Sequence, residues 1–219
     1  MLQQRLEDVE RRICAAAERA HRQREDITLI AVTKKFPAAI IRDAYTLGLR
    51  HFGENYVQEF EEKSLSLSDL TGANFHLIGH LQTNKTRKAA EMFQTIATVD
   101  SIKIAERLNE SGAPLDIMIE VKLSAEEAKF GAAPDDVGAI AEAVRQAKNL
   151  KLLGLMTMPP WSDEAENSRP YFQRLRELAR QHDLKALSMG MSHDLEVGIE
   201  EGATHVRVGT ALFGRRKKE

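Results

Sequence analysis

Short apolar runs alternate with amphipathic segments along the whole chain. The first segment, from Leu2 to Ala20, has apolar side chains at helical spacing between charged positions, which predicts an amphipathic helix. Eight apolar runs follow, each short and rich in residues that favour buried strands. These runs lie within residues 26–37, 51–52, 75–79, 95–99, 115–123, 150–157, 185–188 and 204–208.

Helical patterns separate these runs, so that each predicted strand is followed by a predicted helix. The helices are expected at 38–47, about 55–65, up to about 93, up to 109, about 134–147, about 162–181 and 193–200. Eight strand-then-helix units with short connections predict a closed parallel (β/α)8 barrel, the TIM barrel, with an extra N-terminal helix. A doubly wound open sheet is the alternative, because the runs at 51–52 and 185–188 are short.

Composition narrows this picture without changing it. The 219 residues can bury a sizeable core, and we treat 1–219 as a single domain. A net charge of −2 gives no reason to expect nucleic acid or an anionic membrane as a partner. A lone cysteine, Cys14, excludes an intramolecular disulfide, and no apolar stretch resembles a membrane span or signal peptide. We therefore expect a cytoplasmic protein.

Two lysines, Lys34 and Lys35, end the first predicted strand. An amine at the mouth of a buried strand is partly desolvated, which lowers its pKa and makes it a candidate to condense with an aldehyde. Lysine heads also reach water easily, so both residues can equally be solvated ends of the strand. Strand alternation does not choose between them, because the strand is apolar on both faces.

The segments that follow the seventh and eighth strands suit a phosphate. In parallel barrels the active site lies at the C-terminal ends of the strands, and phosphate commonly binds after strands seven and eight. Here these segments are 188–192, with Ser188 and Ser192, and the pair Gly209 and Thr210, each before a predicted helix start. Serine and Gly-Thr are also ordinary caps and turns, so it is their joint placement that predicts a phosphate site.

Arg207 lies two residues before Gly209, where side-chain alternation along the strand can aim it into the barrel mouth. An ion pair with Glu120 or Glu54 is the alternative to a role in ligand binding. An amine, a guanidinium and a phosphate site at one barrel end together fit an aldehyde that carries a phosphate. Pyridoxal 5'-phosphate (PLP) meets all three demands. His76 and His80 lie on a strand and its loop, so we expect no metal site there.

At these residues the chain resembles the pyridoxal-phosphate homeostasis proteins (the YggS/PROSC family), which look like the barrel domain of fold-type III alanine racemases. The resemblance spans nearly the whole chain. It rests on five blocks in order: AVTK at 31–34; FGENYVQE at 52–59; HLIG at 76–79 with LQ at 81–82 and NK at 84–85; SMGMS at 188–192; and RVGTA at 207–211 with FG at 213–214.

The resemblance selects Lys34 rather than Lys35 as the lysine that forms the aldimine with PLP. It further implies that Arg207 lies beside the pyridine nitrogen and that Asn55 lies near the cofactor. The phosphate would be held by Ser188 or Ser192 with Gly209 and Thr210. Lys122 departs from the family pattern, because such proteins often carry a small polar residue there.

The expected function is PLP homeostasis, meaning reversible storage or delivery of PLP without robust catalysis. A permanent cation beside the ring nitrogen disfavours its protonation, which makes the ring a poorer electron sink. The racemases that the chain resembles also add a second domain with a tyrosine base. The alternatives are a racemase-like amino-acid enzyme on a bare barrel and a Schiff-base aldolase that acts on a phosphorylated sugar. We expect a monomer, with PLP-dependent apoenzymes as candidate recipients.

Overall fold

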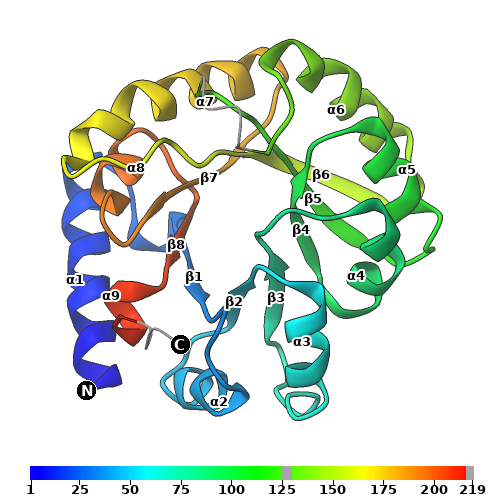
Figure 1. Ribbon diagram of the computed structural model, residues 1–219. Helices are drawn as coiled ribbons and strands as arrows, with labels where there is room; N and C mark the ends of the chain where they lie inside the picture. Colours follow the sequence, from blue (N-terminus) through cyan, green and yellow to red (C-terminus); the bar gives the residue numbers. More distant parts are fainter. Residues whose placement is uncertain (125–129, 216–219) are drawn as a thin grey trace.

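Eight parallel strands close into a barrel in the order of the sequence, and helices surround it (Figure 1). The computed structural model describes residues 1–124 and 130–215. Strand β1 pairs with β2 on one side and with β8 on the other, which closes the sheet. The strands are β1 Thr28–Val32, β2 His51–Glu54, β3 Asn74–Leu77, β4 Thr95–Val99, β5 Leu115–Glu120, β6 Leu150–Met156, β7 Ala186–Met191 and β8 His205–Val208.

An α-helix follows each strand on the outside of the barrel, and α1 comes before the first strand (Figure 1). The α-helices are α1 Leu2–Arg19, α2 Ala38–Thr46, α3 Val57–Ser64, α4 Thr86–Met92, α5 Ile102–Asn109, α6 Val137–Gln146, α7 Arg169–Gln181, α8 Leu195–Glu200 and α9 Thr210–Phe213. Short 3₁₀ helices complete the connections: η1 Arg24–Asp26, η2 Thr83–Lys85, η3 Pro134–Asp136 and η4 Ala165–Ser168.

The apolar core has two parts because successive side chains on a strand point to opposite faces. The larger part fills the space between the strands and the helices. The smaller part lies inside the barrel, and its members are Val32, Ile78, Ala97, Met118 and Met156. With both faces buried, the strands read as continuous apolar runs, as expected for a parallel barrel.

Helix α1 flanks the barrel and does not enter it, because its apolar face, which includes Val9 and Ile13, packs against α8 and α9. An ion pair between Arg12 and Glu196, with 2.6 Å between Nε and Oε1, joins α1 to α8. Arg12 Nη2 also donates to the Ser192 carbonyl at 3.0 Å. The added helix therefore supports the segment that precedes α8.

The predicted barrel and its N-terminal helix are confirmed, and the open sheet is wrong because Leu29 of β1 pairs with Val206 of β8. Some expected element ends differ from the structure. The seventh strand continues to Met191, so that Gly190, expected in a loop, lies in the strand at φ +87°. The helix expected from about 162 begins only at Arg169, after η4.

Candidate functional site

A cavity of about 770 Å³ opens where the strands end, and it contains six of the seven predicted site residues. These six are Lys34, Asn55, Ser192, Arg207, Gly209 and Thr210. Further lining residues are Val32, Ile78, Met158, Trp161, Met191, His193, Ala211 and Arg215. The cavity thus lies between the ends of β1 and β2 and the segments that follow β7 and β8.

Lys34 and Lys35 follow β1 but have different surroundings. Lys34 is half-buried and lines the cavity, whereas Lys35 is exposed and does not line it. The backbone of Lys35 has φ +63°, in the left-handed region that residues other than glycine rarely occupy. This turn separates the two side chains, so that Lys34 is the one that reaches the cavity.

Buried and half-buried charges hold the backbone on both sides of Lys34. Thr33 Oγ1 donates to Glu54 Oε1 at 2.8 Å, and Lys63 Nζ donates to the Thr33 carbonyl at 3.0 Å. Lys63 also forms ion pairs with Glu54 at 2.8 Å and with Glu59 at 2.6 Å. The Lys35 N–H donates to Glu59 Oε1. We call Thr33, Glu54, Glu59 and Lys63 the lysine clamp, because they fix the residues before and after Lys34.

Within the lysine clamp, Glu54 is fully buried, and its environment moves its pKa in two directions. Burial raises the pKa of the Glu54 carboxyl, while the charge and hydrogen bond of Lys63 oppose that rise. Its second oxygen, Oε2, is buried without a hydrogen-bond partner among the described residues. Removing Lys63 would therefore leave a buried acid with only the Thr33 hydroxyl as its partner.

The Arg207 side chain is buried at the base of the cavity. Its Nη1 donates to Ser188 Oγ at 2.7 Å and its Nη2 to the Thr157 carbonyl at 2.9 Å. Burial lowers the pKa of Arg207 to about 10, so the side chain remains a cation at neutral pH. In the described part of the chain no carboxylate lies within ion-pair distance, so the alternative pairing with Glu120 or Glu54 is not seen.

Backbone amides converge on one point at the start of α9. Ser192 Oγ accepts hydrogen bonds from the N–H groups of Gly209 and Ala211, both at 3.2 Å. Amides that together face one oxygen provide an anion site, and the Thr210 hydroxyl is exposed beside them. A Cβ at Gly209 would meet Val32 at 3.4 Å, an ordinary van der Waals contact. The donor set fits a phosphate.

Ser188 is the predicted site residue that does not line the cavity. It lies inside β7, fully buried, and its hydroxyl accepts the hydrogen bond from Arg207. The structure therefore places the Ser192 hydroxyl against the converging backbone amides and the Ser188 hydroxyl against the Arg207 guanidinium.

Asn55 follows β2 and carries a polar atom that lacks a partner. Its Oδ1 is buried and forms no hydrogen bond within the described residues. Buried amide oxygens are nearly always paired in folded proteins, so an unpaired one at a cavity wall indicates a ligand. The neighbouring Gly79 allows this placement, because a Cβ there would lie 2.3 Å from the Asn55 carbonyl oxygen.

The sequence reasoning missed the role of Lys63 and of the cavity residues Trp161 and Met158. Lys63 follows Val57 and Phe60 on the buried face of α3. A lysine on an apolar helix face is a signal that it has a buried partner. Trp161 and Met158 lie in an irregular segment after β6, where no periodic pattern indicates direction. Among the described residues no cluster of side chains could hold a metal ion.

Comparison with known proteins agrees with this geometry. Residues 5–217 match the family model described as alanine racemase, N-terminal domain. The pyridoxal phosphate homeostasis protein of Pseudomonas aeruginosa is 49% identical over 211 residues, which are 94% of this chain and 91% of the relative. The protein of the same name from Aquifex aeolicus is 42% identical and covers 98% of both chains. These relatives are named as homeostasis proteins and not as enzymes.

Solved structures give the same picture. PipY of Synechococcus elongatus, solved with PLP bound, has a TM-score of 0.84 and 39% identity, covering 98% of this chain and 100% of its own. The alanine racemase of Corynebacterium glutamicum, at 18% identity and a TM-score of 0.69, shares the fold. The structural match covers 96% of this chain and 61% of that racemase. The chain belongs to the pyridoxal phosphate homeostasis proteins, a family built on the alanine racemase N-terminal barrel.

Proposed function

We propose that the chain binds PLP through Lys34 and serves intracellular PLP homeostasis, by reversible storage or delivery without robust catalysis. The observation that carries this proposal is the joint presence of a half-buried lysine, a buried arginine and converging backbone amides in one cavity. The names of the relatives and the bound PLP in PipY support it. The proposal treats residues 1–219 as a single PLP-binding unit.

The predicted residues that line the cavity each have a part in the proposal. PLP supplies an aldehyde, with which a lysine amine condenses as a C=N bond forms and one water leaves. Lys34 supplies the amine, and the lysine clamp holds its backbone. Gly209 and Thr210 bind the phosphate together with Ser192, whose hydroxyl already meets these amides. Asn55 offers its unpaired amide oxygen to the ligand.

Arg207 gives the physical reason for weak catalysis. Its cation would stand beside the ring nitrogen and disfavour protonation there, so the ring stabilises a carbanion poorly. Ser188 contributes indirectly, since it holds the guanidinium in place. The tyrosines Tyr45, Tyr56 and Tyr171 are not among the residues that line the cavity, which supports binding over racemisation.

The cellular setting belongs to the same proposal. A single cysteine suits a reducing compartment, and we place the protein in the cytoplasm. Within the described residues, no helix has the length and apolar character needed to cross a membrane. We propose a monomer that passes PLP to PLP-dependent apoenzymes.

Borohydride reduction of the PLP-loaded protein, followed by peptide mass spectrometry, tests the assignment. We expect the PLP adduct on Lys34, loss of that adduct in Lys34→Ala, and its retention in the matched control Lys35→Ala. An adduct found only on other lysines would contradict the site.

Incubation with single-enantiomer amino acids tests the claim of weak catalysis. We expect no robust racemisation by the loaded protein. Robust turnover that Lys34→Ala abolishes would instead establish a racemase.

A further inference from the structure

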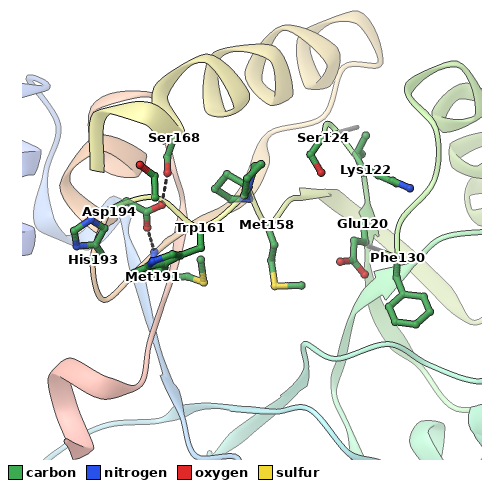
Figure 2. A pocket seen from close by; sticks show the side chains of 14 residues that line it. Glu120, Lys122, Ser124, Phe130, Met158, Trp161, Ser168, Met191, His193 and Asp194 are labelled. Atoms are coloured by element: carbon green, nitrogen blue, oxygen red, sulfur yellow. Dashed lines mark hydrogen bonds between the residues drawn. The ribbon is translucent and has the colours of Figure 1, made fainter. Parts of the chain in front are cut away.

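A second cavity, of about 510 Å³, is shown in Figure 2. It adjoins the Lys34 cavity. Met158, Trp161, Met191 and His193 line both, so the two spaces share a wall. The second cavity lies at the ends of β5 to β7. Its lining is largely apolar, with Val121, Phe130, Met158, Pro159, Pro160 and Trp161.

Among the described residues, two carboxylates face this cavity, and they differ in their partners (Figure 2). Asp194 accepts from Ser168 Oγ and from the Met191 N–H, both at 2.7 Å. Glu120, the last residue of β5, is only 3% exposed, and no hydrogen bond or ion pair to its carboxylate is present among the described residues. Its oxygens turn into the cavity. A carboxylate this deeply buried needs a donor, and the ligand of the cavity can supply one.

The charges around Glu120 come from several elements. Arg207 on β8 attracts its charge from beyond hydrogen-bonding distance, while Asp100 after β4 repels it. Lys122, after β5, and Asp194 also line the cavity. Burial dominates and raises the pKa of Glu120 to about 7. The side chain therefore ionises around neutral pH, which makes it sensitive to a cationic ligand.

Aromatic rings stand at the rim of the cavity. Trp161 is 74% exposed and Phe130 is 56% exposed, values that are unusual for large apolar side chains. The His193 ring lies 5.2 Å from Trp161, and the His80 ring stacks on Phe130 at 3.7 Å. Such rings pack against apolar bodies and attract ammonium groups through their faces.

We propose that this second cavity is a binding site for a small amine, in which a protonated amine group donates to Glu120 and an apolar body packs against Trp161 and Phe130. No covalent step is involved. The site does not use Lys34, so it is independent of the proposed PLP binding.

Trp161 is the one tryptophan of the chain and lines both cavities, so its emission reports a ligand in either cavity, and the Glu120 variant assigns the signal to the second one. The probe is N,N-dimethylbenzylamine, a tertiary amine that cannot form an imine with an aldehyde. We expect saturable changes in tryptophan emission of the PLP-free protein, with affinity weakened at least about tenfold in Glu120→Gln. The matched control Glu164→Gln removes an exposed carboxylate from the Trp161 segment and should leave affinity unchanged.

Two further measurements keep the test decisive even if Glu120→Gln folds poorly. Benzyl methyl ether, a neutral analogue, should bind wild type at least about tenfold more weakly than the amine. Amine affinity should rise from pH 6 to pH 8 as Glu120 loses its proton, and His193→Gln should keep that rise. Equal affinity of Glu120→Gln and wild type, or equal affinity of ether and amine, would overturn the proposal. Lys34→Ala should bind the amine normally, which separates this site from the PLP proposal.

Discussion

The two ends of the barrel handle buried ionisable side chains in opposite ways. Toward the N-terminal ends of the strands, His51, His76 and His205 form a cluster, with His51 Nδ1 3.0 Å from His76 Nε2. Burial lowers the pKa of His76 to about 3 and that of His205 to about 4. These side chains are therefore neutral at physiological pH.

At the C-terminal end, the buried side chains of Arg207 and Glu54 have partners, whereas buried Glu120 has none among the described residues. Arg207 lies two residues beyond His205 on the same strand, and it keeps its proton with two hydrogen bonds. Glu54, three residues beyond His51, is paired with Lys63. Burying an unpaired charge is costly, so a protein either neutralises the group or supplies a partner. The barrel uses the first solution for the histidines near the N-terminal ends of the strands and the second for Arg207 and Glu54 beside the Lys34 cavity.

Removing a partner at the cavity end should have the largest effect. Lys63→Met leaves Glu54 buried without its cation, and we expect a loss of about 3–5 kcal/mol in the free energy of unfolding. Urea denaturation measures this loss. Lys88→Met is the matched control, because it breaks an exposed lysine–glutamate pair with Glu61 and should cost less than about 1 kcal/mol. Equal losses in both variants would show that burial adds nothing to the Lys63–Glu54 pair.

Acidification should destabilise the fold, because His76 and His205 stay neutral in the folded protein while the same residues of the unfolded chain take up protons. Because the folded pKa values of His76 and His205 lie below 6.5, the unfolded chain binds more protons than the folded chain as pH falls below 6.5. Each histidine then removes about 1.4 kcal/mol of stability per pH unit. Glu120, with its pKa raised to about 7, acts in the opposite direction between about 4.5 and 7 and offsets about one histidine.

The net expectation is a loss of about 3 kcal/mol between pH 6.5 and pH 4.5, the effect of about one proton over two pH units. Urea denaturation across this range measures it. Glu120→Gln removes the opposing contribution and should make the fall steeper. Stability that stays constant or rises on acidification would show that the histidines are not buried as neutral groups.

Ser188→Ala tests how far the Arg207 charge depends on its hydrogen bonds. One guanidinium N–H would lose its acceptor inside the barrel, and we expect a loss of about 1–3 kcal/mol in unfolding free energy. Ser64→Ala is the control, because that hydroxyl donates to a carbonyl of its own helix. A loss no larger than that of the control would mean that the Thr157 carbonyl alone supports the charge.

The smallest effect is expected at a partly exposed pair that belongs to neither end. Arg12 and Glu196 are 33% and 30% exposed, so the Arg12→Ala substitution should cost about 1 kcal/mol or less. A double-mutant cycle with Glu196→Ala gives the pair energy. A pair energy for Arg12 and Glu196 larger than that for Lys63 and Glu54 of the lysine clamp would contradict the importance that we give to burial.

Much of the fold was predictable because it depends on local patterns. Alternating apolar runs and amphipathic helices predicted the barrel, which the structure confirms. The end of β7 was misplaced because Gly190 normally marks a turn, yet here it lies in the strand at φ +87°. Trp161 gave no signal, since its segment is irregular and its exposure depends on distant neighbours.

The candidate site shows the same division. Sequence order placed Lys34, Asn55, Arg207 and Gly209 at strand ends, and strand ends of one barrel meet on one side. The roles proposed for these residues toward PLP remain predictions.

By itself, the sequence determined the barrel, the strand ends that carry polar side chains, and the chemistry available there. The resemblance to the family already selected Lys34, but the residue pattern did not, and only the tertiary structure gave the physical reason why Lys34 reaches the cavity and decided which serine lies with the amides. A strand buried on both faces has no polar alternation to reveal direction. That choice comes from contacts between distant residues, where Glu59 binds the Lys35 N–H and Lys63 reaches Thr33 from α3. Such contacts form only when the barrel closes.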